Sequence, residues 1–206
     1  MQPHRATHDR SLGILMTNGI RLLAISGSVR DRSSNTEVLR AFALLAPPSV
    51  TVMQYEGLAT LPAFNPDHDG EGMTPPPAVQ DLRSQLANAD AVVICSPEYA
   101  HGVPGSLKNA LDWLVSVPDM VHKPIALVNA SQRSTHAQLS LAETVRTMSM
   151  HLVAEQPYVV PLVDRGMTSV AIASDPALAA PLRDCLDALI VAVSHDRQAT
   201  PVFSPC

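Results

Sequence analysis

The chain has 206 residues, which suits one domain or one domain with a tail. Hydrophobic residues make up 46% and charged residues 16%, a balance typical of globular rather than disordered chains. The net charge of −5 argues against a nucleic-acid groove, and the three cysteines, odd in number and without metal-ligand spacing, argue against a secreted disulfide framework. Only 3% of the residues are aromatic, so we expect an aliphatic core.

We expect neither a signal peptide nor a membrane-spanning segment. The apolar run before Met16 is too short for the core of a signal peptide, and no run reaches the roughly 18 residues of a membrane helix. We predict a disordered leader over residues 1–19, one domain over residues 20–196 and an irregular tail over residues 197–206. Met16 is a second candidate for the start of translation, and the cytoplasm is the expected compartment.

Short apolar runs alternate with segments of helix-forming residues along the chain. This pattern predicts a parallel sheet covered by helices on both faces, with ligands bound at the carboxyl ends of the strands where the strand order reverses. We therefore expect functional residues after the first, third and fourth strands. In chain order we predict a strand over 21–25, a helix over 35–46, a strand over 50–55, a loop over 56–77, a helix over 78–88, a strand over 91–95, a helix over 105–115, a strand over 124–128, a helix over 135–151, a fifth strand within 153–162 that Pro157 weakens, and a helix over 176–193.

A polar segment follows the first predicted strand and leads into a helix. Residues 26–36 read Ser-Gly-Ser-Val-Arg-Asp-Arg-Ser-Ser-Asn-Thr, and the amino terminus of a helix offers unpaired N–H groups to an anion. Hydroxyl groups and the Arg30 guanidinium can also bind phosphate oxygens, so the segment is a candidate phosphate cradle. The alternative is an ordinary helix start, in which Ser33, Ser34 or Asn35 accepts the first N–H groups.

The same segment lacks the patterns of other phosphate-binding proteins. It contains no Gly-x-x-x-x-Gly-Lys-Ser/Thr, no Gly-x-Gly-x-x-Gly and no cysteine. These absences exclude a nucleoside-triphosphate P-loop, a Rossmann dinucleotide fingerprint and a cysteine-based phosphatase. The segment can hold a phosphate, but it has no evident nucleophile to cleave one.

The segment after the third strand, residues 96–113, is rich in proline and glycine. Gly102 and Gly105 let the backbone approach a flat ligand closely. Tyr99 could pack beside an aromatic ring or serve only as a structural residue of a rigid turn. His101 fits an exposed or capping role as well as a catalytic one. Cys95, at the end of the strand, is interpreted as a buried, inert thiol.

Taken together, these segments resemble the NADPH-dependent FMN reductase family, which includes chromate, quinone and azo-dye reductases. The resemblance extends over about residues 22–131 and implies an α/β, flavodoxin-like three-layer sandwich whose five-stranded parallel sheet has the order 2-1-3-4-5. It rests on Gly27-Ser28-x-Arg30-x-x-Ser33-x-Asn35 after the first strand, on Pro97-Glu98-Tyr99 and Pro104-Gly105-x-Leu107-Lys108-Asn109-Ala110-x-Asp112-Trp113 after the third, and on Leu61-Pro62-x-Phe64-Asn65-Pro66-Asp67 and Lys123-Pro124-Ile125 elsewhere.

The resemblance also implies which residues bind FMN. The phosphate would be held by Ser28, Arg30, Ser33, Ser34 and Asn35, the isoalloxazine would be lined by Pro97, Glu98, Tyr99 and Ala100, and Ser131 matches a further flavin contact. The chain departs from the family in two places. Ala100 stands where the family usually has Asn, and residues 132–136 contain no glycine where the family often has a glycine-rich segment.

The function implied is electron transfer from NADPH or NADH through bound FMN to a small acceptor, such as a flavin, quinone, azo compound or metal oxyanion. The flavin carries out the chemistry, so we assign no catalytic acid or base and no metal ligand. The alternatives are an FMN-binding electron carrier or redox sensor without efficient NAD(P)H turnover, and a structural role without flavin. The family resemblance also implies a homodimer or homotetramer, with Trp113 either at the interface or buried within its own subunit.

Overall fold

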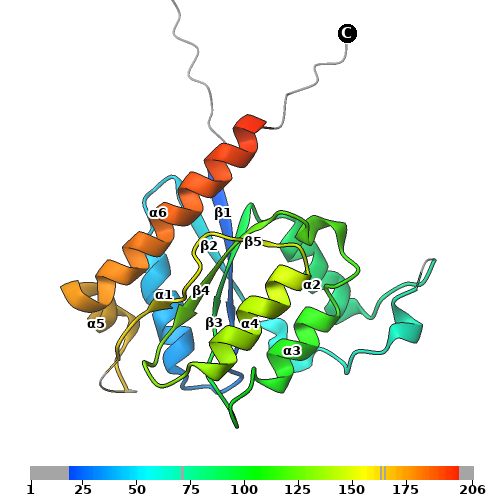
Figure 1. Ribbon diagram of the computed structural model, residues 1–206, viewed down its shortest axis with the longest axis horizontal. Coiled ribbons are helices and arrows are strands. Elements are labelled where there is room, and N and C mark those ends of the chain that lie inside the picture. The colour runs from blue at the N-terminus through cyan, green and yellow to red at the C-terminus, as the bar shows by residue number, and fades with distance from the viewer. Residues whose placement is uncertain (1–18, 71, 163, 165, 200–206) are drawn as a thin grey trace, which may run out of the picture.

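The computed structural model describes residues 19–70, 72–162, 164 and 166–199. A parallel sheet with the order β2-β1-β3-β4-β5 forms the middle layer, which confirms the predicted flavodoxin-like order (Figure 1). A further short strand, β6, also pairs with β4. The strands are β1 (Ile20–Ser26), β2 (Val50–Tyr55), β3 (Ala91–Cys95), β4 (Pro124–Asn129), β5 (His151–Leu152) and β6 (Tyr158–Val159).

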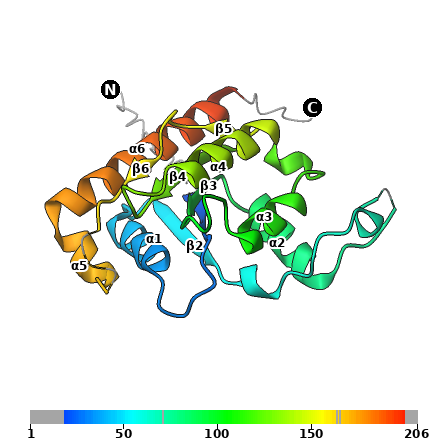
Figure 2. The same ribbon diagram turned by 60° about the horizontal axis from the view of Figure 1, so that its bottom comes forward.

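Helices cover both faces of this sheet (Figures 1 and 2). Successive side chains of β1 alternate between the faces: Leu23 and Ile25 pack with α2, α3 and α4, whereas Leu22 and Ala24 pack with α1, α5 and α6. The two clusters are mainly aliphatic, as the composition predicted. The helices are α1 (Ser34–Leu45), α2 (Pro77–Ala87), α3 (Gly105–Asp112), α4 (His136–Thr147), α5 (Ser169–Ser174) and α6 (Pro176–Ala199).

The strand order reverses at β1, which lies between β2 and β3. Ser26, the last residue of β1, is in register with Cys95, the last residue of β3. Because all pairs are parallel, the segments after β1, β3 and β4 leave the sheet at one edge. This edge carries the segments in which functional residues were expected.

The fifth strand was predicted incorrectly. In place of one strand within 153–162, two strands of two residues each pair with opposite ends of β4: His151 with Pro124, and Tyr158 with Val128. Pro157 lies between them and has no N–H to donate to a ladder, which explains the interruption.

Two helix ends also differ from the prediction. The helix predicted to run to residue 151 ends at Thr147, because Ser149 adopts a left-handed φ of 59° and the chain turns into β5. The last helix continues past residue 193 to Ala199, so the prediction of irregular structure is wrong for residues 197–199. The rest of that tail, and residues 1–18 of the predicted leader, lie outside the described residues. No helix in the described ranges combines the length and apolar character needed to cross a membrane.

The segment between β2 and α2 was predicted to be a loop, and it contains two short 3-10 helices, Gly57–Thr60 and Pro66–His68. Figure 2 shows this segment leaving β2 and running outward beside α2 and α3. Asn109 of α3 fastens it, because its side chain accepts from the Phe64 N–H at 2.7 Å and donates to the Pro62 carbonyl at 2.9 Å. Trp113 donates to the same carbonyl at 2.9 Å. Its side chain is fully buried in its own subunit.

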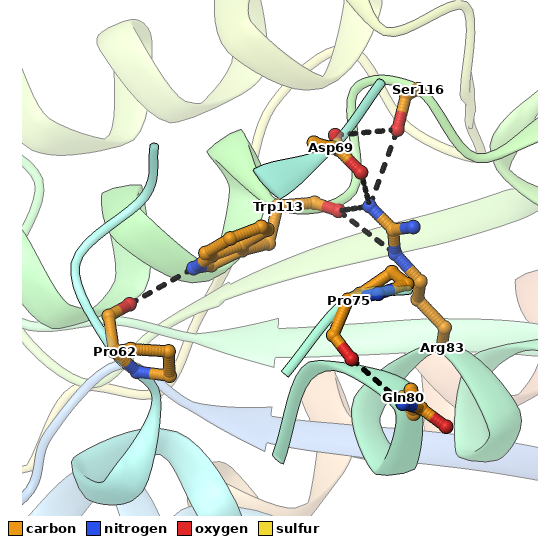
Figure 3. A network of polar contacts seen from close by, with 7 residues as sticks. All are labelled: Pro62, Asp69, Pro75, Gln80, Arg83, Trp113 and Ser116. Atoms are coloured by element: carbon orange, nitrogen blue, oxygen red, sulfur yellow. Dashed lines mark hydrogen bonds and ion pairs between the residues drawn. The ribbon is translucent and has the colours of Figure 1, made fainter. Parts of the chain in front are cut away.

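A second set of contacts joins the same segment to α2 (Figure 3). The Arg83 guanidinium forms an ion pair with Asp69 at 2.5 Å and donates to the Trp113 carbonyl at 2.6 Å. The hydroxyl of Ser116 donates to the other carboxylate oxygen of Asp69 at 2.7 Å. The Asp69 side chain is only 9% exposed, so this carboxylate depends on its partners for compensation of its charge.

We predict that Arg83→Met lowers the free energy of unfolding by about 2–3 kcal/mol, because it leaves a nearly buried carboxylate with one hydroxyl partner. The matched control is Arg146→Met, which breaks an ion pair with Glu155, whose side chain is 87% exposed. That change is expected to cost less than about 1 kcal/mol. Urea unfolding of the two variants measures the difference, and equal losses would contradict the importance assigned to Asp69.

Candidate functional site

The segment after β1 folds back on the first turn of α1 through its own hydroxyl groups. The Thr36 hydroxyl donates to Ser26 Oγ at 3.0 Å, and Ser26 Oγ also accepts from the Ser28 N–H at 3.3 Å. Ser28 Oγ accepts from the Arg30 N–H at 3.4 Å. Ser33 is the residue that caps α1, accepting from the Thr36 N–H at 3.4 Å. The segment therefore encloses the positive end of the helix.

Gly27 brings this segment against the end of β3. Its N–H donates to the Cys95 carbonyl at 2.9 Å. A Cβ atom at this position would lie 2.6 Å from Ser96 Oγ and 3.0 Å from a methyl carbon of Leu107. Only glycine therefore lets the segments after β1 and β3 lie this close together.

A cavity of about 340 Å³ adjoins the segment. It extends between α1 and the carboxyl end of β2, and Ser28 and Arg30 are among its lining residues; the other predicted FMN residues are not. Gln54, on its β2 side, has a buried Nε2 donor without a hydrogen-bond partner in the described structure. The Arg30 guanidinium forms no ion pair with any described carboxylate. A guanidinium beside a helix amino terminus fits the phosphate of a ligand such as FMN.

Asn35 points into the protein. Its side-chain oxygen accepts from the Cys95 thiol at 3.3 Å, and its side chain is nearly buried. Burial raises the pKa of the Cys95 thiol well above its ordinary range, in keeping with the interpretation of an inert cysteine. Asn35 thus ties the start of α1 to the end of β3. Ser33 serves as the helix cap that the sequence left as an alternative.

The loop after β3 forms a two-residue hairpin. The Tyr99 N–H donates to the Gly102 carbonyl at 3.1 Å, and the Gly102 N–H donates back to the Tyr99 carbonyl at 2.9 Å. The two residues between them, Ala100 and His101, have left-handed φ angles of 50° and 60°. This is the conformation of a type I′ turn, which usually carries Asn or Gly. The Tyr99 side chain is half exposed at the base of the turn.

Glu98 connects this hairpin to α4. One carboxylate oxygen accepts from the Ala137 N–H at 2.9 Å, and the other lies 3.0 Å from His101 Nδ1. The Ala137 N–H, with His101 and His136, lowers the pKa of Glu98, so the group is an anion at neutral pH. Gln138 adds a second tie, because its side chain donates to the Ser96 carbonyl at 3.1 Å.

These α4 residues were not found from the sequence. The segment that leads into α4 has no glycine and matches no phosphate or metal motif, so nothing singles out His136 or Gln138 before the fold brings α4 beside the loop after β3.

Comparison with known proteins decides the family. The model of the NADPH-dependent FMN reductase family matches residues 20–163. This chain belongs to the NADPH-dependent FMN reductase family. This membership confirms the resemblance inferred from the motifs. It also confirms the predicted function, an FMN-dependent oxidoreductase that uses NAD(P)H.

Two reductases similar in sequence agree with this assignment, and a solved structure shares the fold. An NAD(P)H-dependent FMN reductase from Pseudomonas aeruginosa is 34% identical over 141 residues, 66% of this chain and 75% of that protein. A quinone reductase from Escherichia coli is 37% identical over 119 residues, 56% of this chain and 62% of that protein. The flavoenzyme NAD(P)H:(acceptor) oxidoreductase FerB from Paracoccus denitrificans superposes with a TM-score of 0.70 at 22% identity, covering 85% of this chain and 98% of that one.

Residues 132–136, the glycine-free segment, are one of the two places where this FMN reductase departs from its family. Side-chain hydrogen bonds hold the conformation of the turn that contains them. Asn129, at the end of β4, accepts from the Ser131 N–H at 3.0 Å and donates to the Ser134 carbonyl at 2.9 Å. The Ser131 hydroxyl accepts from the Arg133 N–H at 3.2 Å. Asn129 is nearly buried and was not singled out from the sequence. Its amide shapes this edge of the site in place of glycine.

Ala100 is the other departure, and the hairpin explains what Asn does at this position. A left-handed conformation costs an L-residue other than Gly, Asn or Asp roughly 1–2 kcal/mol. We predict that Ala100→Asn raises the free energy of unfolding by up to about 1 kcal/mol, because Asn adopts this conformation more readily. FMN affinity is expected to stay the same or to rise.

Ala100→Val is the control, since a β-branched residue strains the same backbone and is expected to lower stability by about 1–2 kcal/mol. Thermal unfolding of both variants and FMN fluorescence titrations measure these effects. Changes in the same direction for Asn and Val would contradict the left-handed turn, and weaker FMN binding by the Asn variant would contradict a family-like loop.

Proposed function

We propose that the protein transfers electrons from NADPH or NADH, through bound FMN, to a quinone-type acceptor. The phosphate cradle carries the proposal: the Arg30 guanidinium, which has no ion-pair partner among the described residues, and the amino terminus of α1 lie at the edge of the sheet where the strand order reverses. The names of several relatives point to the acceptor class, including the quinone reductase of E. coli and a 2-hydroxy-1,4-benzoquinone reductase of Burkholderia, which is 34% identical over 94 residues.

Each part of the site has a distinct task in this proposal. Ser28, Arg30 and the first turn of α1 hold the phosphate, and the segment containing Ser33, Ser34 and Asn35 keeps that turn in place. The hairpin segment from Pro97 to Ala100 lies along the ring, with Ser131 on its β4 side. Bound FMN would supply the redox chemistry, which is hydride uptake from the nicotinamide and electron transfer to the acceptor. The protein orients the ring and leaves one side open for both substrates.

The test is NADPH oxidation by FMN-loaded protein with and without benzoquinone. We expect quinone-dependent turnover in the ordinary enzyme range of about 1–1,000 per second, and none without FMN. Protein that binds FMN and exchanges electrons after chemical reduction, but does not oxidise NADPH or NADH, would instead be the electron carrier or sensor that the altered segment over residues 132–136 left as an alternative.

The phosphate assignment has its own prediction. Arg30→Ala is expected to weaken FMN binding about 10- to 100-fold, because a charge-assisted hydrogen bond contributes about 1.5–3 kcal/mol. Riboflavin, which lacks the phosphate, is expected to bind both proteins equally. Arg32→Ala is the matched control, because Arg32 lies in the same segment but does not line the cavity. Fluorescence titrations measure all four affinities, and equal losses for FMN and riboflavin would reject the assignment.

We also propose a cytoplasmic homodimer or homotetramer built from the domain that begins at residue 20 and includes α6 to Ala199. NAD(P)H is an intracellular reductant, and the two described cysteines, Cys95 and Cys185, are unpaired and buried. Val115, Val121 and Leu139 expose more than half of their side-chain surface on the α3 and α4 side of the sheet, which supports association there. Light scattering after size-exclusion chromatography measures the state.

A further inference from the structure

Two imidazoles and a carboxylate meet at the tip of the hairpin after β3. His101 Nδ1 lies 3.0 Å from Glu98 Oε1, and the His101 side chain is 78% exposed. The ring of His136, the first residue of α4, meets the His101 ring edge-to-face with centroids 4.5 Å apart. Glu98 and His136 are the titratable groups that contact His101 among the described residues.

The orientation of His101 follows from the way Glu98 is held. The second Glu98 oxygen is occupied by the Ala137 N–H, so the carboxylate cannot turn away from the hairpin. As an anion, Glu98 only accepts, and His101 must therefore donate from Nδ1. This leaves Nε2 as the nitrogen that can pass a proton to another molecule.

The backbone holds the ring in this place at an energetic cost. His101 has a left-handed φ of 60° directly after Ala100 at 50°, and two adjacent left-handed residues without glycine are uncommon. Such strain persists where the surrounding structure maintains it, here the paired hydrogen bonds of Tyr99 and Gly102. The hairpin leaves the sheet at the same edge as the phosphate segment and α4, beside the position proposed for the ring.

We propose that His101 is the residue that protonates the acceptor, with Glu98 as a positioning residue that sets its tautomer and His136 as a second imidazole packed against it. This inference rests on the proposed function. It extends the role of the loop beyond cofactor binding to catalysis.

The chemistry balances for a quinone. Its reduction to a hydroquinone takes two electrons and two protons. A hydride equivalent from the bound cofactor brings both electrons and one proton. The second proton passes from His101 Nε2 to a quinone oxygen, breaking the N–H bond and forming an O–H bond. His101 is left neutral, and its exposure lets it regain the proton from water.

The decisive experiment compares two acceptors on FMN-loaded protein that has first been reduced. Benzoquinone requires protons, whereas ferricyanide takes one electron at a time and requires none. Stopped-flow reoxidation is expected to slow with benzoquinone as the pH rises, because the proton donor loses its proton, and to change little with ferricyanide. His101→Asn, which suits the left-handed backbone, is expected to slow benzoquinone reduction about 100-fold and to leave ferricyanide reduction unchanged.

His122→Asn is the matched control, because His122 is also exposed and also has a φ of 60°, but it lies in the turn before β4. It is expected to affect neither acceptor. A His101 variant that reduces benzoquinone at the wild-type rate, or that loses both acceptors equally, would overturn the proposal. Failure of wild-type protein to reduce either acceptor would instead reject the proposed function.

A measurement that needs no turnover tests the positioning. Above pH 8, nitrogen chemical shifts are expected to show His101 with its proton on Nδ1, the less common tautomer of a free imidazole. Glu98→Gln is expected to abolish this preference, because a neutral amide no longer requires a donor at Nδ1. Retention of the tautomer in that variant, or the Nε2–H tautomer in the wild type, would contradict the role given to Glu98.

Discussion

The Gly27 N–H donates to the Cys95 carbonyl across the carboxyl ends of β1 and β3, at 2.9 Å, and the rest of the site is arranged around this contact. A side chain at residue 27 would collide with Ser96, so the two loops can meet only because this position is glycine. FMN has a phosphate at one end and a flat ring at the other. A protein that binds it needs two such loops side by side, one for each end, and the reversal of strand order at β1 supplies them.

The two halves of the site are stabilised in different ways. The phosphate side is held by hydroxyl contacts within its own segment, and Gly27 and Asn35 join it to the end of β3. The side toward the ring is held by α4, through Glu98 on the Ala137 N–H and Gln138 on the Ser96 carbonyl. Asn129 shapes the turn that leads into α4. Changes in α4 therefore reach the hairpin directly.

The parts of the fold that sequence analysis predicted are those with a strong local signal. β1, β3 and β4 are continuous apolar runs, and strands buried on both faces give this pattern. The prediction of the fifth strand failed because the pairing with β4 is divided around Pro157. A short edge strand also leaves little hydrophobic pattern in the sequence. The end of α4 was predicted incorrectly because Ser149, in a left-handed conformation, terminates the helix, whereas glycine is the usual sequence signal for a helix end.

In the candidate site, too, features with a local sequence signal could be predicted, and features that depend on contacts between distant segments could not. The candidate cradle could be proposed from the sequence because its residues are consecutive and precede a helix. The two loops that form the site were predicted from strand ends alone. The ties to α4 could not be predicted, because Glu98 and Ala137 are brought together only by the pairing of β3 with β4. The direction of Asn35 could not be predicted either, since it depends on the position of Cys95 in a neighbouring strand.

The motifs of this family therefore combine two kinds of information. Asn109 and Trp113 lie in a motif that follows β3, yet their side chains bind the Pro62 carbonyl, and their contribution is to fasten the segment after β2 against α3. Such residues identify the scaffold without specifying an acceptor. We infer that the choice of acceptor depends on the side chains exposed at the carboxyl edge of the sheet. These side chains lie in the hairpin and at the start of α4, where this chain departs from its family. Substitutions at these positions are expected to change the acceptor of a reductase of this fold without changing its cofactor.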